Sequence, residues 1–143
     1  MYNILLHGWF SIGPKIGCPN HLLTALFDKQ MQATEIEMSN ADKVKELNDA
    51  ARQSFTGCRV MITRGVAALD CVDTVLTAVR SYTDFSVSND PYHEHDFGSF
   101  TVAGAQLFWK FDYLDPDMQM ASLDAADDTI TVRVLTIMLA EEY

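Results

Sequence analysis

The chain has 143 residues and a mass of 16.0 kDa, which is the size of one ordinary domain. Hydrophobic residues make up 48% of it and charged residues 21%, a composition too apolar for an intrinsically disordered protein. The net charge of −10 disfavours direct binding to nucleic acid, and no apolar run reaches the about 18 residues of a membrane span.

Residues 1–37 differ from the rest of the chain, because they hold two of the four prolines and show no clean hydrophobic periodicity. We interpret them as an N-terminal extension, followed by a single compact domain over residues 38–143. The domain is predicted to begin with a helix over residues 39–55, where Ser39 and Asp42 form a start resembling a capping box.

A short strand and a second helix are predicted next. The run RVMIT at residues 59–63 is rich in β-forming residues, and Gly65 turns the chain. Residues 70–80 place valines and a leucine on one helical face, with Asp70 as the expected cap.

Two further runs, residues 97–102 and 106–113, predict a β-hairpin whose turn is Ala103-Gly104. Counting outward from this turn places the large apolar side chains of the second strand on one face, which we expect to be the core face. Gly98 then lies opposite Trp109 and makes room for its ring.

The segment from residue 124 to 143 fits two interpretations. Residues 129–135 alternate like a strand, yet the apolar positions also follow a helical period, and Asp127 and Asp128 suit the start of a helix. We predict a helix here. The expected fold is therefore α+β: a small antiparallel sheet with a central hairpin, packed against about three helices.

The same hairpin register places His95 opposite Asp112, with Lys110 on the same face and Glu94 next in the chain. A carboxylate beside an imidazole fixes its tautomer and can make it a general base, so these four residues are the candidate catalytic set. The alternative is a hydrogen bond that only holds the end of the hairpin. Neither a metal site nor a cofactor is predicted.

The charge imbalance lies entirely in the C-terminal part of the chain. Residues 84–143 contain twelve acidic residues and two basic ones, whereas residues 1–83 contain eight of each. This pattern favours a basic protein partner, although acidity can also serve solubility alone. The candidate partner-binding residues are Asp84, Asp90, Asp96, Asp115, Asp117, Asp124, Asp127 and Asp128.

Three cysteines without a C-x-x-C spacing indicate free thiols in a reducing compartment. We therefore expect a cytoplasmic protein without a membrane segment, and a homodimer is left open.

Several short motifs together resemble one protein family. They include NDPYHEHDFGSF (89–100), LFWKFDY (107–113) and VRVLTIMLAEEY (132–143). From about residue 44 onward the chain resembles a bacterial, mostly proteobacterial, family known only as a domain of unknown function. Tyr92-His93 stands where the family pattern N-D-P-x-x-E-H-D-F-G has His-Gly. The resemblance implies a setting as cargo of plasmids, phages and integrating elements.

Two functions are expected from these observations. The first is an acidic, non-enzymatic binding protein that inhibits a nucleic-acid-handling host defence complex of the anti-CRISPR or antirestriction type. The second is a small hydrolase that uses the His-Asp dyad at the end of the hairpin.

Overall fold

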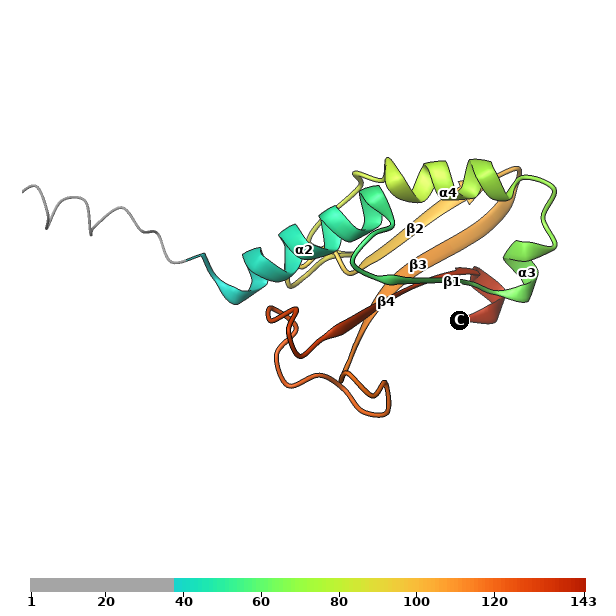
Figure 1. Cartoon of the computed structure of the whole chain (residues 1–143). Helices are drawn as coiled ribbons and strands as arrows, with labels where there is room; N and C mark the ends of the chain where they lie inside the picture. The colour runs from blue at the N-terminus through green and yellow to red at the C-terminus, as the bar shows by residue number, and fades with distance from the viewer. Residues whose placement is uncertain (1–37) are drawn as a thin grey trace, which may run out of the picture. The chain divides into compact units, whose positions relative to one another are not determined.

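The computed structural model describes residues 38–143, so the predicted N-terminal extension lies outside the described residues. Figure 1 shows the order of the elements along the chain. The helices are α2 (Asn40–Ser54), α3 (Arg64–Ala67) and α4 (Val72–Arg80), the strands are β1 (Arg59–Ile62), β2 (Phe97–Val102), β3 (Ala105–Leu114) and β4 (Val132–Leu139), and a short 3-10 turn, η1 (Ala140–Glu142), follows β4.

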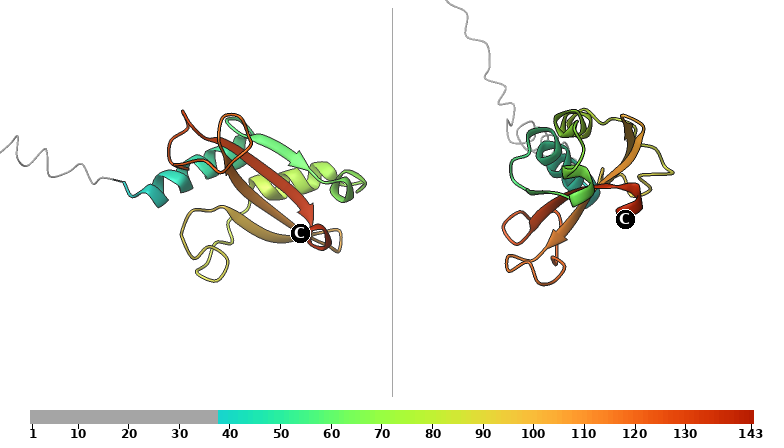
Figure 2. Two further views of the ribbon diagram at one scale, coloured as in Figure 1. Left: turned by 90° about the horizontal axis from the view of Figure 1, so that it is seen from below. Right: turned by 90° about the vertical axis from the view of Figure 1, so that its right-hand side faces the viewer.

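The four strands form one mixed sheet in the order β1-β4-β3-β2. β1 runs parallel to β4, and the other neighbours are antiparallel. Helices α2 and α4 cover one face of this sheet, as the end-on view of Figure 2 shows. The predicted α+β class is confirmed, but the parallel pairing of β1 makes the sheet mixed rather than antiparallel, and the third helix is the short α3.

The two helices predicted before the hairpin are confirmed, with one correction to a cap. Ser39 caps α2 by accepting a hydrogen bond from the backbone N–H of Asp42, and the helix ends where Phe55 adopts a left-handed conformation with φ of 57°. Helix α4 ends at Arg80 as expected, but Cys71 rather than Asp70 occupies its N-cap position, with no side-chain cap. No helix of the described residues is long and apolar enough to cross a membrane.

The predicted hairpin is confirmed in its turn and its register. Val102 pairs with Ala105, and Phe97 pairs with Lys110 at the other end. Ala103 and Gly104 both have positive φ values, as a tight turn of this length requires. A Cβ atom at position 98 would lie 2.3 Å from Trp109 Nε1, so the ring occupies the space that the missing side chain leaves.

The predicted C-terminal helix is wrong, because residues 132–139 form the strand β4. This strand lies inside the sheet between β1 and β3. A strand with both faces covered is apolar on both faces and shows no clean alternation, which explains why the pattern also fitted a helix. Asp127 belongs to the preceding loop, where its carboxylate accepts from the backbone N–H of Thr129.

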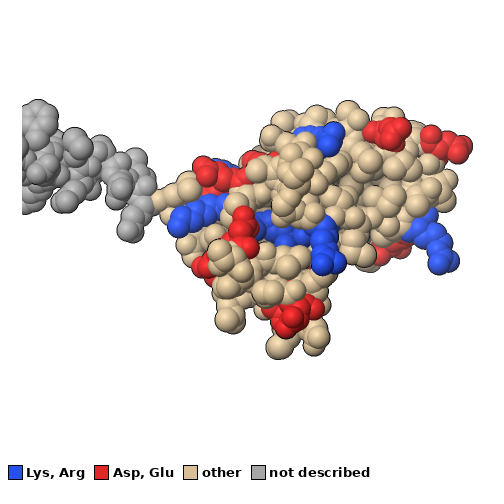
Figure 3. Space-filling model, in the orientation of Figure 1, with Lys and Arg blue, Asp and Glu red and all other residues tan. Residues whose placement is uncertain are grey.

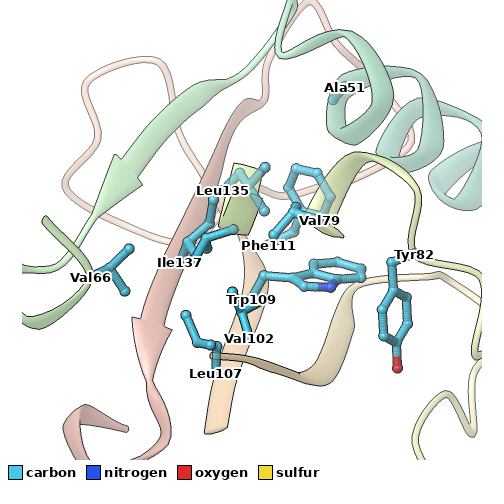
Figure 4. Close-up of a cluster of buried hydrophobic side chains, with 11 residues drawn as sticks. Ala51, Val66, Val79, Tyr82, Val102, Leu107, Trp109, Phe111, Leu135 and Ile137 are labelled. Atoms are coloured by element: carbon cyan, nitrogen blue, oxygen red, sulfur yellow. The ribbon is translucent and has the colours of Figure 1, made fainter. Parts of the chain in front are cut away.

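The core lies between the helices and the sheet, around the fully buried Trp109 (Figure 4). Ala51 of α2 and Val79 of α4 pack onto the sheet from the helical side. The edges of Tyr82 and Phe111 meet the Trp109 ring, with centroids 5.5 and 6.0 Å away. This packing fixes the position of β3 relative to both helices.

Candidate functional site

The loop between α4 and β2, residues 81–96, is held by the polar residues of its own motif. The Asn89 side chain accepts from the backbone N–H of Ser86 and donates to the carbonyl of Asp84. Asp90 is only 1% exposed, and Oδ1 of its side chain accepts hydrogen bonds from the backbone N–H groups of Glu94 and His95. These contacts explain the Asn-Asp pair of the motif as a support for the loop.

His95 contacts α2 and its own loop instead of the hairpin. Its Nδ1 lies 2.9 Å from Oδ2 of Asp49, and its Nε2 lies 3.7 Å from Oδ2 of Asp90. The imidazole stacks on the ring of Phe85, with centroids 3.5 Å apart and planes within 2°. Two carboxylates and one aromatic face therefore fix the ring.

The predicted contact between His95 and Asp112 is wrong. β2 begins only at Phe97, and His95 has a left-handed backbone with φ of 52°, so the hairpin register does not extend to it. Its side chain turns to the face that the helices cover. Asp112 instead lies 2.8 Å from Nζ of Lys110. The four residues of the candidate catalytic set thus do not form one cluster.

A buried arginine, Arg52, joins this site to the core. It is 2% exposed, its Nη2 lies 2.9 Å from Oδ1 of Asp49, and its Nη1 donates to the carbonyls of Val79 and Arg80. Its guanidinium lies over the ring of Trp109. Sequence analysis missed Asp49 and Arg52, although their spacing of three residues on one helix was a usable signal.

A hollow of about 420 Å³ opens beside His95 and is lined by Asp49, Gln53, Arg80 and neighbouring residues. In the described part of the chain, the His95 imidazole has no hydroxyl or thiol within hydrogen-bond distance. Residues 38–143 also contain no group of three or more His, Cys, Asp or Glu side chains that could hold a metal ion. In the described residues, the hollow therefore has no nucleophile aligned on the imidazole.

A second polar group lies where α2 meets β3. The buried Asn48 donates to the carbonyl of Glu94 and to the hydroxyl of Tyr113, and its Oδ1 accepts from Nε of Arg133. Burial raises the pKa of Tyr113 far above its usual range. Burial, followed by repulsion from neighbouring carboxylates, also raises the pKa of Glu94. Burial also raises the pKa of Asp96, against a smaller lowering by a backbone hydrogen bond.

These two carboxyl groups are expected to make the fold less stable as the pH rises. A carboxyl whose pKa is raised holds its proton more tightly in the folded state, so its contribution falls as the pH increases through the folded pKa. The double variant Glu94→Gln, Asp96→Asn should therefore have a higher urea midpoint than the wild type at pH 7, and this gain should shrink towards pH 4. An exposed control, Glu141→Gln, should show neither effect. An equal or lower midpoint for the double variant at pH 7 would contradict this expectation.

The candidate partner-binding aspartates do not form one surface. Asp90 is buried and cannot contact a partner, which corrects its assignment, and Asp96 is half-buried. Asp84 is exposed on the loop before β2. Figure 3 shows acidic and basic side chains interspersed on the visible face. The remaining five lie in the segment between β3 and β4, residues 115–131, called here the acidic loop: Asp115, Asp117, Asp124, Asp127 and Asp128.

The fold and these sites define a small α+β domain with a mixed four-stranded sheet, a pinned histidine and an acidic loop. Residues 62–142 match the family described as proteins of unknown function, DUF3768, and the chain belongs to this family. No curated protein and no solved structure matches the chain. The match begins after α2, so Asp49 and Arg52 lie outside the matched segment.

Proposed function

We propose that the protein is a non-enzymatic binding protein that uses the acidic loop to engage a basic surface of a nucleic-acid-handling host defence complex and inhibits that complex. The observation that carries this proposal is the composition of the acidic loop together with the hydrogen bonds that fix its backbone. It holds carboxylates and large apolar side chains in solvent on a backbone fixed by internal hydrogen bonds.

Hydrogen bonds to the loop's own side chains define its conformation. Oδ1 of Asp115 accepts from the backbone N–H groups of Gln119 and Met120. The hydroxyls of Ser122 and Thr131 lie 2.6 Å apart and link the middle of the loop to its C-terminal end. The buried Arg133 donates to Asp128 and to the carbonyl of Ala125. A surface that is ordered before binding loses less conformational entropy when a partner docks.

Three large apolar side chains project from this loop. Leu123 is 96% exposed and Met120 71%, and Ile130 is also exposed. Exposed apolar groups surrounded by polar residues are typical of protein interaction sites, where a few buried anchors supply most of the affinity. Leu123 is the strongest candidate for such an anchor.

The carboxylates around these anchors are mostly unneutralised. Among residues 38–143, only Asp128 of the five loop aspartates forms an ion pair. Free carboxylates complement the Lys- and Arg-rich grooves in which proteins bind nucleic acid phosphates. The family resemblance to mobile-element cargo points to a host defence complex as the owner of such a groove.

The alternative, a small hydrolase centred on His95, has less support. Both ring nitrogens of His95 face carboxylates, and Asp112 and Lys110 belong to a different part of the sheet. An imidazole held between two carboxylates contributes to the stability of the loop that carries it.

The triple variant Asp117→Asn, Asp124→Asn, Asp127→Asn tests the proposed surface. Asparagine keeps the oxygen that accepts the loop hydrogen bonds but removes the charge. In a pull-down from lysate of a host with an active defence system, the wild type should retain subunits of the defence complex at low salt and release them at high salt. The triple variant should retain at least about tenfold less, an energy difference of about 1.4 kcal/mol.

The matched control is the variant Glu46→Gln, Asp70→Asn, Asp73→Asn, which removes the same charge from exposed positions outside the candidate partner-binding set. It should behave like the wild type. Retention of defence subunits that is insensitive to salt, or equal for the two triple variants, would overturn the proposed surface.

A further inference from the structure

The free edge of β1 is the most apolar exposed strand of the described structure. All four of its residues are exposed, including Val60 at 37%, Met61 at 55% and Ile62 at 40%. Figure 2 shows β1 at the border of the sheet, where β4 is its only paired neighbour among residues 38–143. The strand contains no lysine, proline or bulge of the kinds that usually protect such an edge.

Within the described part of the chain, some backbone groups of β1 have no partner at this edge. The N–H of Thr63 donates to the carbonyl of Ile137 in β4, and successive residues of a strand point their polar groups in alternate directions. The N–H and C=O groups of Val60 and Ile62 therefore face away from the sheet. They are available to another extended strand.

The sequence of β1 is complementary to itself in one register. A two-fold axis perpendicular to the sheet places the same face of both copies on the same side. If this axis passes beside Met61, it pairs Val60 of one copy with Ile62 of the other. Met61 then meets its own symmetry mate in a non-hydrogen-bonded position. Val60 and Ile62 form the hydrogen-bonded pairs, and apolar side chains meet apolar side chains throughout.

The charges at the two ends of the strand are complementary in the same register. Arg59 is exposed and forms no ion pair within residues 38–143, and it would lie opposite Thr63 of the other copy. The hydroxyl of Thr63 donates to Glu142 at 2.5 Å, which places a carboxylate at that point. Each copy would thus offer Arg59 to Glu142 of the other, twice across the axis.

We infer that two copies of this chain pair through antiparallel β1 strands to form a continuous sheet with Met61 on the two-fold axis. A contact confined to such a short strand buries less than a standard interface, so the dimer is weak, with a dissociation constant of micromolar order. The dimer does not depend on the acidic loop and goes beyond the proposed function.

Sedimentation of the full chain over a range of concentrations tests this dimer. The wild type should shift from its 16.0 kDa monomer towards twice that mass as the concentration rises. Met61→Lys places two like charges opposite each other and should weaken the dimer at least about tenfold. The control Thr101→Lys, at an exposed position of the other edge strand, should sediment like the wild type. A wild type that stays monomeric, or a Met61→Lys variant that dimerises normally, would overturn the inference.

A cross-linking measurement on exposed positions tests the register itself. Facing residues in a non-hydrogen-bonded antiparallel pair have Cα atoms about 4.5 Å apart, within the range that a disulfide spans. Mild oxidation of Met61→Cys should link position 61 to position 61 of a second copy, identified by peptide mapping. Ile62→Cys should not link to itself, because position 62 faces position 60. Absence of the 61–61 link, or equal linking at position 62, would refute this register.

Discussion

Adding one methyl group at position 98 is expected to lower the free energy of unfolding by about 3 kcal/mol. The new Cβ would lie 2.3 Å from Nε1 of Trp109 and 2.5 Å from its Cε2. The ring cannot move aside easily, because Tyr82, Phe85 and Phe111 all meet it and Arg52 lies over it. Urea unfolding of Gly98→Ala, followed by circular dichroism, measures the loss.

A second substitution shows whether the clash with the indole is the cause. Trp109→Phe is destabilising by itself because it leaves a cavity, but it removes the ring atoms that the new methyl group would hit. The double variant Gly98→Ala, Trp109→Phe should therefore lose less stability than the two single variants added together. Strict additivity, or a loss below about 1 kcal/mol for Gly98→Ala, would show that the strand adjusts without cost.

The variant Arg133→Met should destabilise the fold by about 2–4 kcal/mol and also weaken partner binding. Arg133 is 2% exposed and bonds to Asn48 in α2 and to Asp128 and Ala125 in the acidic loop. Methionine fills part of the volume but leaves buried acceptors without donors. The acidic loop should lose its fixed position, so it should be cleaved by protease faster than in the wild type.

The exposed Lys43→Met provides the control, because it removes the same charge from a side chain that forms no ion pair among residues 38–143 and lies outside the proposed dimer strand. It should leave the unfolding free energy within about 0.5 kcal/mol of the wild type. Arg133→Met with unchanged stability and unchanged protease resistance would show that the loop is supported by its own turns alone.

Local patterns predicted those parts of the fold that local physics determines. The cap at Ser39 and the turn at Ala103-Gly104 follow from neighbouring residues, and so does the space for Trp109 at Gly98. β4 was missed because a strand covered on both faces loses its alternation, and the two acidic residues before it mimic a helix start.

The candidate site was harder to predict because it depends on backbone conformations and on packing between distant elements. The left-handed backbone of residue 95 ends the strand register, and no pattern in the sequence predicts this conformation. The partner of His95, Asp49, lies 46 positions away in α2. Five of the eight candidate aspartates lie in the acidic loop, where their role in binding stays a prediction. The burial of Asp90 depends on the loop that it supports.

The motif around His95 now has a structural explanation residue by residue. Asn89 and Asp90 bond to loop backbone, His95 fixes the loop to α2, and Gly98 admits the indole. These roles explain the motif by contacts within the fold, whereas Met120 and Leu123 of the acidic loop remain exposed to solvent.

The efficiency of phage plating on a host with an active restriction or CRISPR system tests the central claim most directly. The strains would express the wild type, the triple variant of Asp117, Asp124 and Asp127, or His95→Asn, in which asparagine tolerates the left-handed backbone and can still donate to Asp49. We expect the wild type and His95→Asn to raise plating equally, and the triple variant to fall to the level of the empty vector. Loss of the effect in His95→Asn, with full activity of the triple variant, would contradict a binding function and favour a reaction at the histidine.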